Sequence, residues 1–131
     1  MPHLQFETTV DLDDDETAPF TDWVTELYAH VMDTGTDHVA VTVRNHPAAA
    51  LSLGRAGPDE PVAVVNADVR AGRSADQRRE LAESLVGELD ARFGVPTANC
   101  YVVYTEHPGE DFHLAEGPLA SWDHDEDDPT E

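Results

Sequence analysis

The order of hydrophobic and polar residues along the chain changes its period several times. Side chains alternate between apolar and polar over 2–9, which predicts a strand. Apolar residues then recur every three or four positions over 17–32, which predicts an amphipathic helix that stops near Gly35. Alternation returns over 38–44 and predicts a second strand.

The same order of elements occurs again in the second half of the chain. A strand is predicted over 61–68. Ser74 and Gln77 have the spacing of a capping box, so we expect a helix to begin there and to end at Gly94. A further strand is predicted over 99–105.

The remaining segments are predicted to be short or irregular. We expect an acidic loop at 11–16, a short edge strand at 48–53 and a loop at 54–60. Residues 112–122 are expected to form a short closing segment. The last nine residues, 123–131, include six acids, and we expect them to be a disordered tail.

These elements predict one α/β domain, 1–122, made of two strand–helix–strand units, 1–60 and 61–122. Each unit is expected to be a right-handed crossover between parallel strands. Two such units make a four-stranded mixed sheet with both helices on one face. Because the strands carry apolar residues on more than one side, we expect copies of the chain to cover the other face.

The charge of the chain is strongly negative. It contains 28 acidic residues against seven arginines and no lysine, a formal net charge of -21. Salt at about 1 M reduces the Debye length to roughly 3 Å and screens most of this repulsion, so we expect a protein adapted to a very salty cytoplasm, as in haloarchaea. Clustered positive charge would be needed to bind nucleic acid or an anionic membrane, so neither partner is expected.

The chain carries no signal that directs it to a membrane or out of the cell. It has no apolar run near the roughly 18 residues that span a bilayer, and its first residues lack the regions of a signal peptide. A cytoplasmic location is therefore expected. The single Cys100 excludes an intrachain disulfide, and we interpret it as a small apolar residue on a strand.

Pro2 is the first candidate for chemistry. A small second residue favours removal of Met1, which would leave a secondary amine at the start of the first strand. Burial among apolar groups disfavours the charged form of an amine and lowers its pKa. A neutral amine can take a proton from a carbon next to a carbonyl. The alternative is that this proline has no special role, since Pro follows Met in many unrelated proteins.

Arg70 and Arg73 are the second candidate. They lie where a strand passes into a helix, close to Ser74. An arginine fork suits a carboxylate, and the first turn of a helix adds favourable backbone dipoles. The residues alone fit an anion site and a pair of surface ion pairs equally well.

Pro2, the two repeated units and residues 71–74 resemble the tautomerase superfamily, which includes 4-oxalocrotonate tautomerase, macrophage migration inhibitory factor and cis-3-chloroacrylic acid dehalogenase. The resemblance extends from Pro2 to about Trp122 and is strongest from Pro61 onward. It implies a homotrimer that needs no cofactor. It also implies proton transfer on small enol, 2-oxo or unsaturated carboxylates.

The chain is most similar to the dehalogenase among the long, fused members of this superfamily. His30 precedes Thr34 and Gly35 at the spacing found there, and Arg70, Arg73 and Ser74 match its Arg-x-x-Arg-Ser pattern. The resemblance implies that Pro2 is the catalytic amine. It further implies that three side chains hold the substrate carboxylate or polarise its carbonyl: His30, Arg70 and Arg73.

Other positions depart from the family pattern. Val103 stands where the dehalogenase has a tyrosine, with Tyr104 beside it, and Tyr101 stands where 4-oxalocrotonate tautomerase has an arginine. Tyr104 and Glu116 are therefore candidates for substrate contacts, Glu116 being the nearest match to a glutamate that activates water. Phe112 matches an active-site aromatic and fits either an apolar wall of the site or the core.

Three functions follow from this resemblance. The first is a tautomerase or isomerase in which Pro2 acts as general base and then general acid. The second is a hydratase or dehalogenase with a charged Pro2 acting as an acid, and the third is a binding module without catalysis. His107 and His113 are interpreted as loop residues, and no metal site is expected.

Overall fold

The structure is a computed structural model in which residues 2–118 are described. Met1 and residues 119–131 lie outside the described residues. The predicted acidic tail, 123–131, and the last part of the closing segment therefore fall outside them as well.

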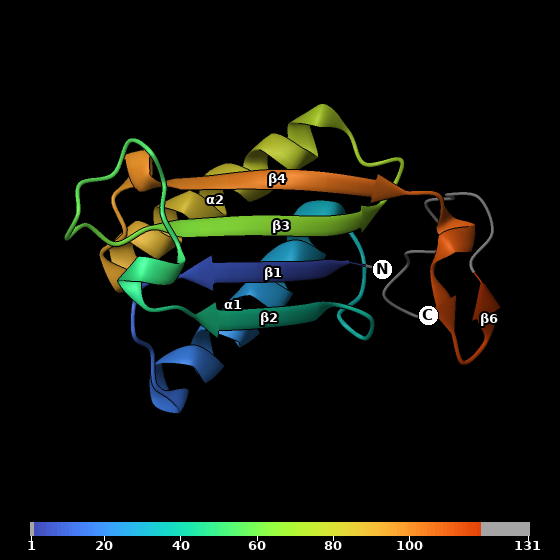
Figure 1. The fold of residues 1–131 in the computed structure, drawn as a ribbon. Coiled ribbons are helices and arrows are strands. Elements are labelled where there is room, and N and C mark those ends of the chain that lie inside the picture. Colours follow the sequence, from blue (N-terminus) through green and yellow to red (C-terminus); the bar gives the residue numbers. More distant parts are fainter. Residues whose placement is uncertain (1, 119–131) are drawn as a thin grey trace.

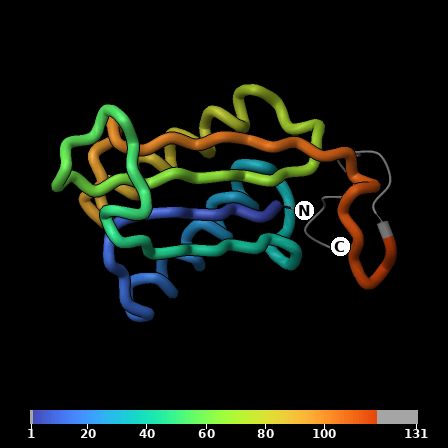
Figure 2. The backbone as a smooth tube through the Cα atoms, viewed as in Figure 1, coloured from blue at the N-terminus to red at the C-terminus, as the bar shows by residue number. Residues whose placement is uncertain are grey.

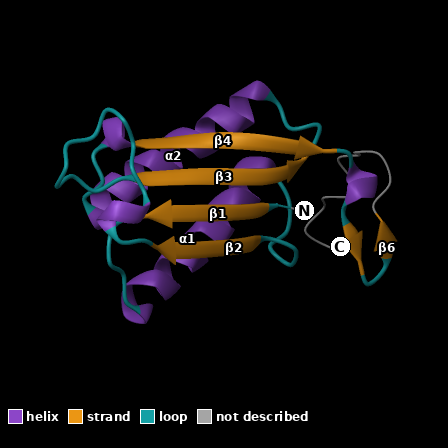
Figure 3. Ribbon diagram, viewed as in Figure 1, coloured by secondary structure: helices purple, strands orange, loops and turns teal. Residues whose placement is uncertain are grey.

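The chain forms a four-stranded sheet and two long helices (Figures 1 and 3). The main elements are β1 (His3–Thr8), α1 (Asp14–Met32), β2 (Ala40–Asn45), β3 (Ala63–Arg70), α2 (Ala75–Phe93) and β4 (Cys100–His107). The described chain also contains three single turns of 3-10 helix: η1 (Ala48–Ala50), η2 (Thr97–Asn99) and η3 (Gly109–Asp111). A small hairpin follows, made of β5 (His113–Leu114) and β6 (Gly117–Pro118).

The sheet has the order β2-β1-β3-β4. β1 is parallel to β2 and β3 is parallel to β4, so each β-α-β unit is a crossover between parallel strands. The two units are joined by antiparallel pairing of β1 with β3, and both helices cover the same face of the sheet (Figure 1). This confirms the α/β fold class expected from the sequence.

The hydrophobic core lies between the sheet and the two helices. Phe20 of α1 makes edge-to-face contacts within it to Phe6 at 5.0 Å and to Phe93 at 5.1 Å between ring centroids. Fully buried side chains from every layer belong to the same core: Leu4, Val24, Tyr28, Val65, Val69, Leu81 and Leu85. Helix packing against β1 and β3 therefore fixes the central strands of the sheet.

Helix α1 begins earlier than its apolar pattern predicts. The Asp13 side chain accepts a hydrogen bond from the Glu16 backbone N–H, and the Glu16 side chain accepts one from the Asp13 N–H, so a capping box opens the helix. Three acids in the first turn also favour the positive end of the helix dipole. The helix ends with Asp33 in the left-handed conformation, at φ 54°, two residues before Gly35.

The second unit follows the sequence prediction more closely. Ser74 and Gln77 form the expected capping box, and Gly94 ends α2 at φ 73°. The predicted edge strand at 48–53 is wrong: residues 48–50 form η1, closed by a hydrogen bond from the Ala50 N–H to the Pro47 carbonyl. Pro61 precedes β3 much as Pro2 precedes β1.

The chain trace shows that the two ends of the sheet differ (Figure 2). β1 begins at the end where β3 and β4 finish, and residues 46–62 connect β2 to β3 at the opposite end. Among the described residues, no helix is long and apolar enough to cross a membrane.

Replacing the cap of α2 should weaken the fold without touching the core. We expect Ser74→Ala to lower the free energy of unfolding by about 1 kcal/mol, because the Gln77 N–H loses its acceptor. The measurement is denaturant unfolding at fixed protein and salt concentrations. Ser52→Ala, at an exposed loop position, is the control and should change stability by less than about 0.5 kcal/mol.

Candidate active site

One end of the sheet collects most of the candidate residues. We call it the Pro2 end; it is defined by Pro2 before β1, Arg70 at the end of β3 and His107 at the end of β4. The register brings these strand ends together, because His3 pairs with Asp68 and Arg70 pairs with His107. The end of α1 and the start of α2 lie at this same end (Figure 1).

Pro2 is buried where the chain enters the sheet. Its carbonyl accepts a hydrogen bond from the Ala40 N–H at 3.1 Å, which continues the parallel pairing of β1 with β2 by one residue. Its backbone is thereby tied to a strand of the sheet. A terminal amine at this position would therefore be held by the scaffold rather than by a loop.

Arg70 and Arg73 are both buried, and Arg70 is 0% exposed. Arg70 is the last residue of β3. The next N–H, of Ala71, donates to the His107 carbonyl at 2.7 Å, so the parallel pairing of β3 with β4 extends to the strand end. Both guanidinium groups thus lie inside the protomer, at the junction of β3 and α2.

Arg73 has a structural contact that its sequence position did not reveal. One of its Nη atoms donates to the Met32 carbonyl at 3.0 Å, and the Gln77 side-chain amide donates to the Val31 carbonyl at 3.3 Å. The last carbonyls of a helix have no partner within the helix. Side chains from the start of α2 therefore satisfy the end of α1 and fix the two helices to one another.

His30 lies in the last turn of α1, next to this junction, and its side chain is exposed. His30 therefore lies near the Pro2 end, because α1 ends there (Figure 1). Its contact with a substrate stays a prediction.

Tyr104 belongs to the helix side of the sheet. Its hydroxyl donates to the Arg78 carbonyl of α2 at 2.7 Å. Burial, followed by the neighbouring Tyr28, raises the pKa of Tyr104 above its usual value, against a smaller opposing effect of Arg78. Tyr104 is thus a neutral donor with a structural contact, and its substrate role stays a prediction.

Phe112 and Glu116 lie on the segment that follows β4. The half-buried ring of Phe112 makes an edge-to-face contact with His107, at 5.6 Å between ring centroids. Glu116 is exposed in the turn between β5 and β6, and this hairpin lies beyond the Pro2 end of the sheet (Figure 1). Phe112 is therefore close to the strand ends, whereas Glu116 sits on a projecting turn.

His107 is a residue of this end that sequence reasoning missed. The prediction that it is a loop residue is wrong, since it is the last residue of β4. Its Nε2 lies 3.0 Å from an Oδ of Asp68. Asp68 also accepts hydrogen bonds from Gln5 at 2.8 Å and from Asn66 at 3.1 Å. The parallel order of β3 and β4 is the signal that would have placed the two residues together.

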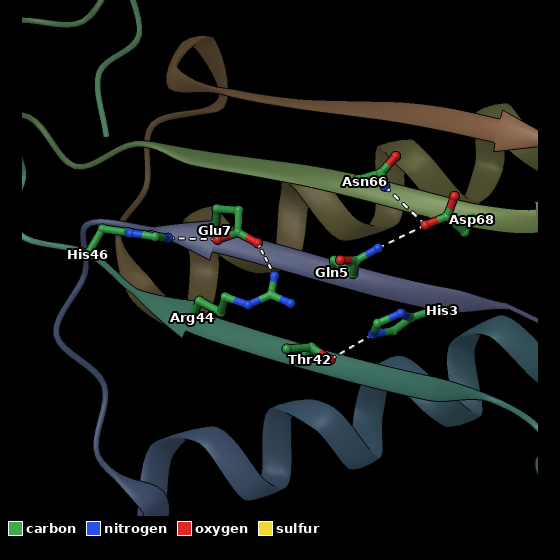
Figure 4. Close-up of polar contacts among 8 residues, drawn as sticks. All are labelled: His3, Gln5, Glu7, Thr42, Arg44, His46, Asn66 and Asp68. Atoms are coloured by element: carbon green, nitrogen blue, oxygen red, sulfur yellow. Dashed lines mark hydrogen bonds and ion pairs between the residues drawn. The ribbon is translucent and has the colours of Figure 1, made fainter. Parts of the chain in front are cut away.

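The sheet face away from the helices is polar. Figure 4 shows Gln5 and Asn66 pointing at Asp68, and Arg44 and His46 pointing at Glu7. Burial of the Glu7 carboxylate opposes its ionisation, but the hydrogen bonds and charges of His46 and Arg44 outweigh burial and lower the pKa of Glu7.

The expectation that an apolar surface needs cover on this face is therefore wrong for the central strands. Tyr101 and Val103 of β4, 47% and 46% exposed, are its large exposed apolar side chains within the described chain.

Other parts of the described chain lack the features of a catalytic site. Hollows around Thr9 and Ala48 lie at the opposite end of the sheet, and acidic side chains such as Asp11 and Glu60 line them. Burial raises the pKa of the Cys100 thiol to about 11, so it is a poor nucleophile. Over residues 2–118, no three metal-ligating side chains come together as a metal site.

A comparison with protein families identifies the chain. The sequence model of a family described as "Tautomerase enzyme" matches residues 40–115, more than half of the chain. The chain belongs to the tautomerase family. Comparison with curated proteins gave no match.

Solved structures of other proteins share the fold of this chain. It is similar to N1, a member of the cis-3-chloroacrylic acid dehalogenase family, with a TM-score of 0.79 and 25% identity over 91% of this chain and 84% of that one. It is similar to Pt0534 inactivated by 2-oxo-3-pentynoate, with a TM-score of 0.78 and 18% identity over 90% of this chain and 95% of that one. It is also similar to the Q0 fused 4-OT symmetric trimer, with a TM-score of 0.78 and 19% identity over 90% of this chain and 95% of that one.

The positive charge of this chain is unevenly distributed. Four of its seven arginines fall within residues 70–79, at the Pro2 end: Arg70, Arg73, Arg78 and Arg79. Arg78 is paired with Glu106 at 3.2 Å and Arg79 with Asp76 at 3.1 Å. In a chain of net charge -21, more than half of the arginines are therefore concentrated at this end.

The contact of Arg73 with α1 leads to a stability prediction. We expect Arg73→Met to lower the free energy of unfolding by about 2 kcal/mol, because the Met32 carbonyl loses a charged donor. The matched control is Arg79→Met, which removes an exposed ion pair and should cost less than about 1 kcal/mol.

Urea unfolding at constant salt and protein concentration measures both variants. Equal stability of Arg73→Met and the unmodified protein would contradict a structural role and leave this guanidinium available to a substrate alone.

Proposed function

We propose that this protein is a cofactor-independent tautomerase or isomerase that acts on small enol, 2-oxo or unsaturated carboxylates. Pro2, freed by loss of Met1, is the general base and then the general acid. The observation that carries the proposal is the position of Pro2, buried and paired to β2, at the sheet end where Arg70 and Arg73 also lie. Family membership supports the same chemistry.

The surroundings of Pro2 suit a neutral amine. Pro2 is buried, and burial favours the uncharged form of an amine, which is the form that accepts a proton from carbon. Arg70 would bind the substrate carboxylate and stabilise the negative charge of the enolate. Arg73 would assist and His30 would orient the substrate, with Tyr104, Phe112 and Glu116 as further candidate contacts.

We also propose that the working form is a homotrimer in the cytoplasm of a cell with high internal salt. The Q0 fused 4-OT neighbour is a symmetric trimer of the same fold. The charge of -21 favours folding and assembly where salt screens repulsion. Tyr101 and Val103 are available on the face away from the helices for contact with another copy.

The direct test replaces the proposed base. We expect Pro2→Ala to reduce kcat for ketonisation of phenylenolpyruvate by at least about 100-fold, the usual share of a general acid or base, while unfolding stability changes little. The assay is made at molar salt, and mass spectrometry of the intact protein establishes that Met1 is absent. Unchanged turnover in Pro2→Ala would remove Pro2 from the mechanism.

A second candidate is a hydratase or dehalogenase that adds water to a 3-substituted acrylate. The similarity to N1, at 25% identity, favours it. In this reaction Pro2 is charged and acts as an acid. The two candidates therefore require opposite protonation states of the same nitrogen at neutral pH.

Nitrogen-15 NMR of the Pro2 amine, titrated in high salt, separates the two enzymatic candidates. We expect the amine to be mostly neutral at pH 7.5, because burial opposes its charge. An amine still fully protonated there would contradict tautomerase chemistry and favour addition of water. The absence of both turnover across a panel of enols and labelling of Pro2 by 3-bromopropiolate would indicate a binding module instead.

A further inference from the structure

Asp68 and His107 form a pair at the Pro2 end that the proposed mechanism does not use. The His107 Nε2 lies 3.0 Å from an Asp68 carboxylate oxygen. Both side chains are accessible, at 34% and 27% exposure, and both lie on the polar face of the sheet. A carboxylate that orients an imidazole in this way makes the imidazole a better proton acceptor.

The pair is held rigidly by its surroundings. Gln5 and Asn66 donate to the same oxygen of Asp68, so the carboxylate is fixed from β1 and from β3 (Figure 4). The His107 ring packs edge-to-face on Phe112. Its backbone carbonyl accepts from Ala71. Contacts with Asp68 of β3 and with Phe112 of the following segment thus set the position of the imidazole.

The pair is also close to Pro2 along the sheet. His3, the residue after Pro2, is the register partner of Asp68. Neighbouring strands lie about 4.8 Å apart, so β4 and β1 are about 10 Å apart across β3. The His107 ring reaches back toward β3 to meet Asp68. A small unsaturated acid is of the right size to contact both the Pro2 nitrogen and the imidazole.

We propose that His107, oriented by Asp68, is a second proton-transfer group that handles the oxygen of the substrate while Pro2 handles its carbon. This inference rests on the proposed function. In the enol-forming direction, the neutral Pro2 amine takes a proton from the carbon next to the carbonyl, and the electron pair of that C–H bond forms the C=C bond. The carbonyl oxygen takes a proton from the His107 imidazolium and becomes the enol hydroxyl. Ketonisation is the reverse of this step.

Proton exchange with water restores both groups after the step. After enolisation the Pro2 ammonium loses its proton to solvent and the neutral imidazole gains one. Because Nε2 is engaged by Asp68, Nδ1 is the nitrogen that exchanges the proton with the substrate. In this proposal Arg70 still binds the substrate carboxylate. His107 shares the proton transfer with Pro2 and takes no part in binding the anion.

The test compares variants in the ketonisation of phenylenolpyruvate at molar salt. We expect His107→Ala to reduce kcat by about 100-fold with KM changed less than about threefold, and free imidazole to restore part of the rate. Asp68→Asn should reduce kcat about tenfold, because it keeps the size of the side chain and removes its charge. The control is His113→Ala, an exposed histidine of the hairpin, which should retain full activity.

Two measurements separate this inference from the proposed function. Labelling of Pro2 by 3-bromopropiolate should proceed in His107→Ala as in the unmodified protein, since the amine is untouched. Should His107→Ala fold poorly, kcat of His107→Gln and Asp68→Asn is compared with that of the unmodified protein instead. A kcat for His107→Ala equal to that of the unmodified protein, or a loss that imidazole does not rescue, overturns the role of His107 and leaves Pro2 chemistry intact. An unmodified protein without turnover or labelling overturns both.

Discussion

The antiparallel pairing of β1 with β3 is the constraint on which the structure depends. It joins the two β-α-β units within the sheet, and it extends over six residue pairs. Its register sets His3 opposite Asp68. A shift by one residue would turn every side chain of β1 to the other face, which would expose Leu4 and Phe6 and separate Pro2 from the end of β3.

Most of the fold follows from local patterns in the sequence. The change of hydrophobic period places the strands and helices, and Ser74 and Gly94 mark the limits of α2 because capping chemistry is local. The start of α1 was missed for a physical reason. A run of acids predicts a solvated loop, yet the same acids cap a helix and favour its dipole, as Asp13 and Glu16 do.

The candidate site was harder to predict because its contacts are not local. The position of Arg73 after a strand indicated an anion site, but a guanidinium group donates to a backbone carbonyl as readily as to a carboxylate, and sequence does not tell Met32 from a ligand. His107 was missed because its partner is 39 residues away. Only the alignment of parallel strand ends brings Asp68 and His107 together.

The near-repeat of the two units makes the protomer almost symmetrical in shape but one-sided in chemistry. Pro61 precedes β3 much as Pro2 precedes β1. The nitrogen of Pro61, however, forms an amide with Glu60, so its lone pair is delocalised and does not accept a proton. Pro61 therefore cannot act as a base at the far end of the sheet. The long connection of residues 46–62 occupies that end, and acidic side chains such as Glu60 lie there, away from the Pro2 end.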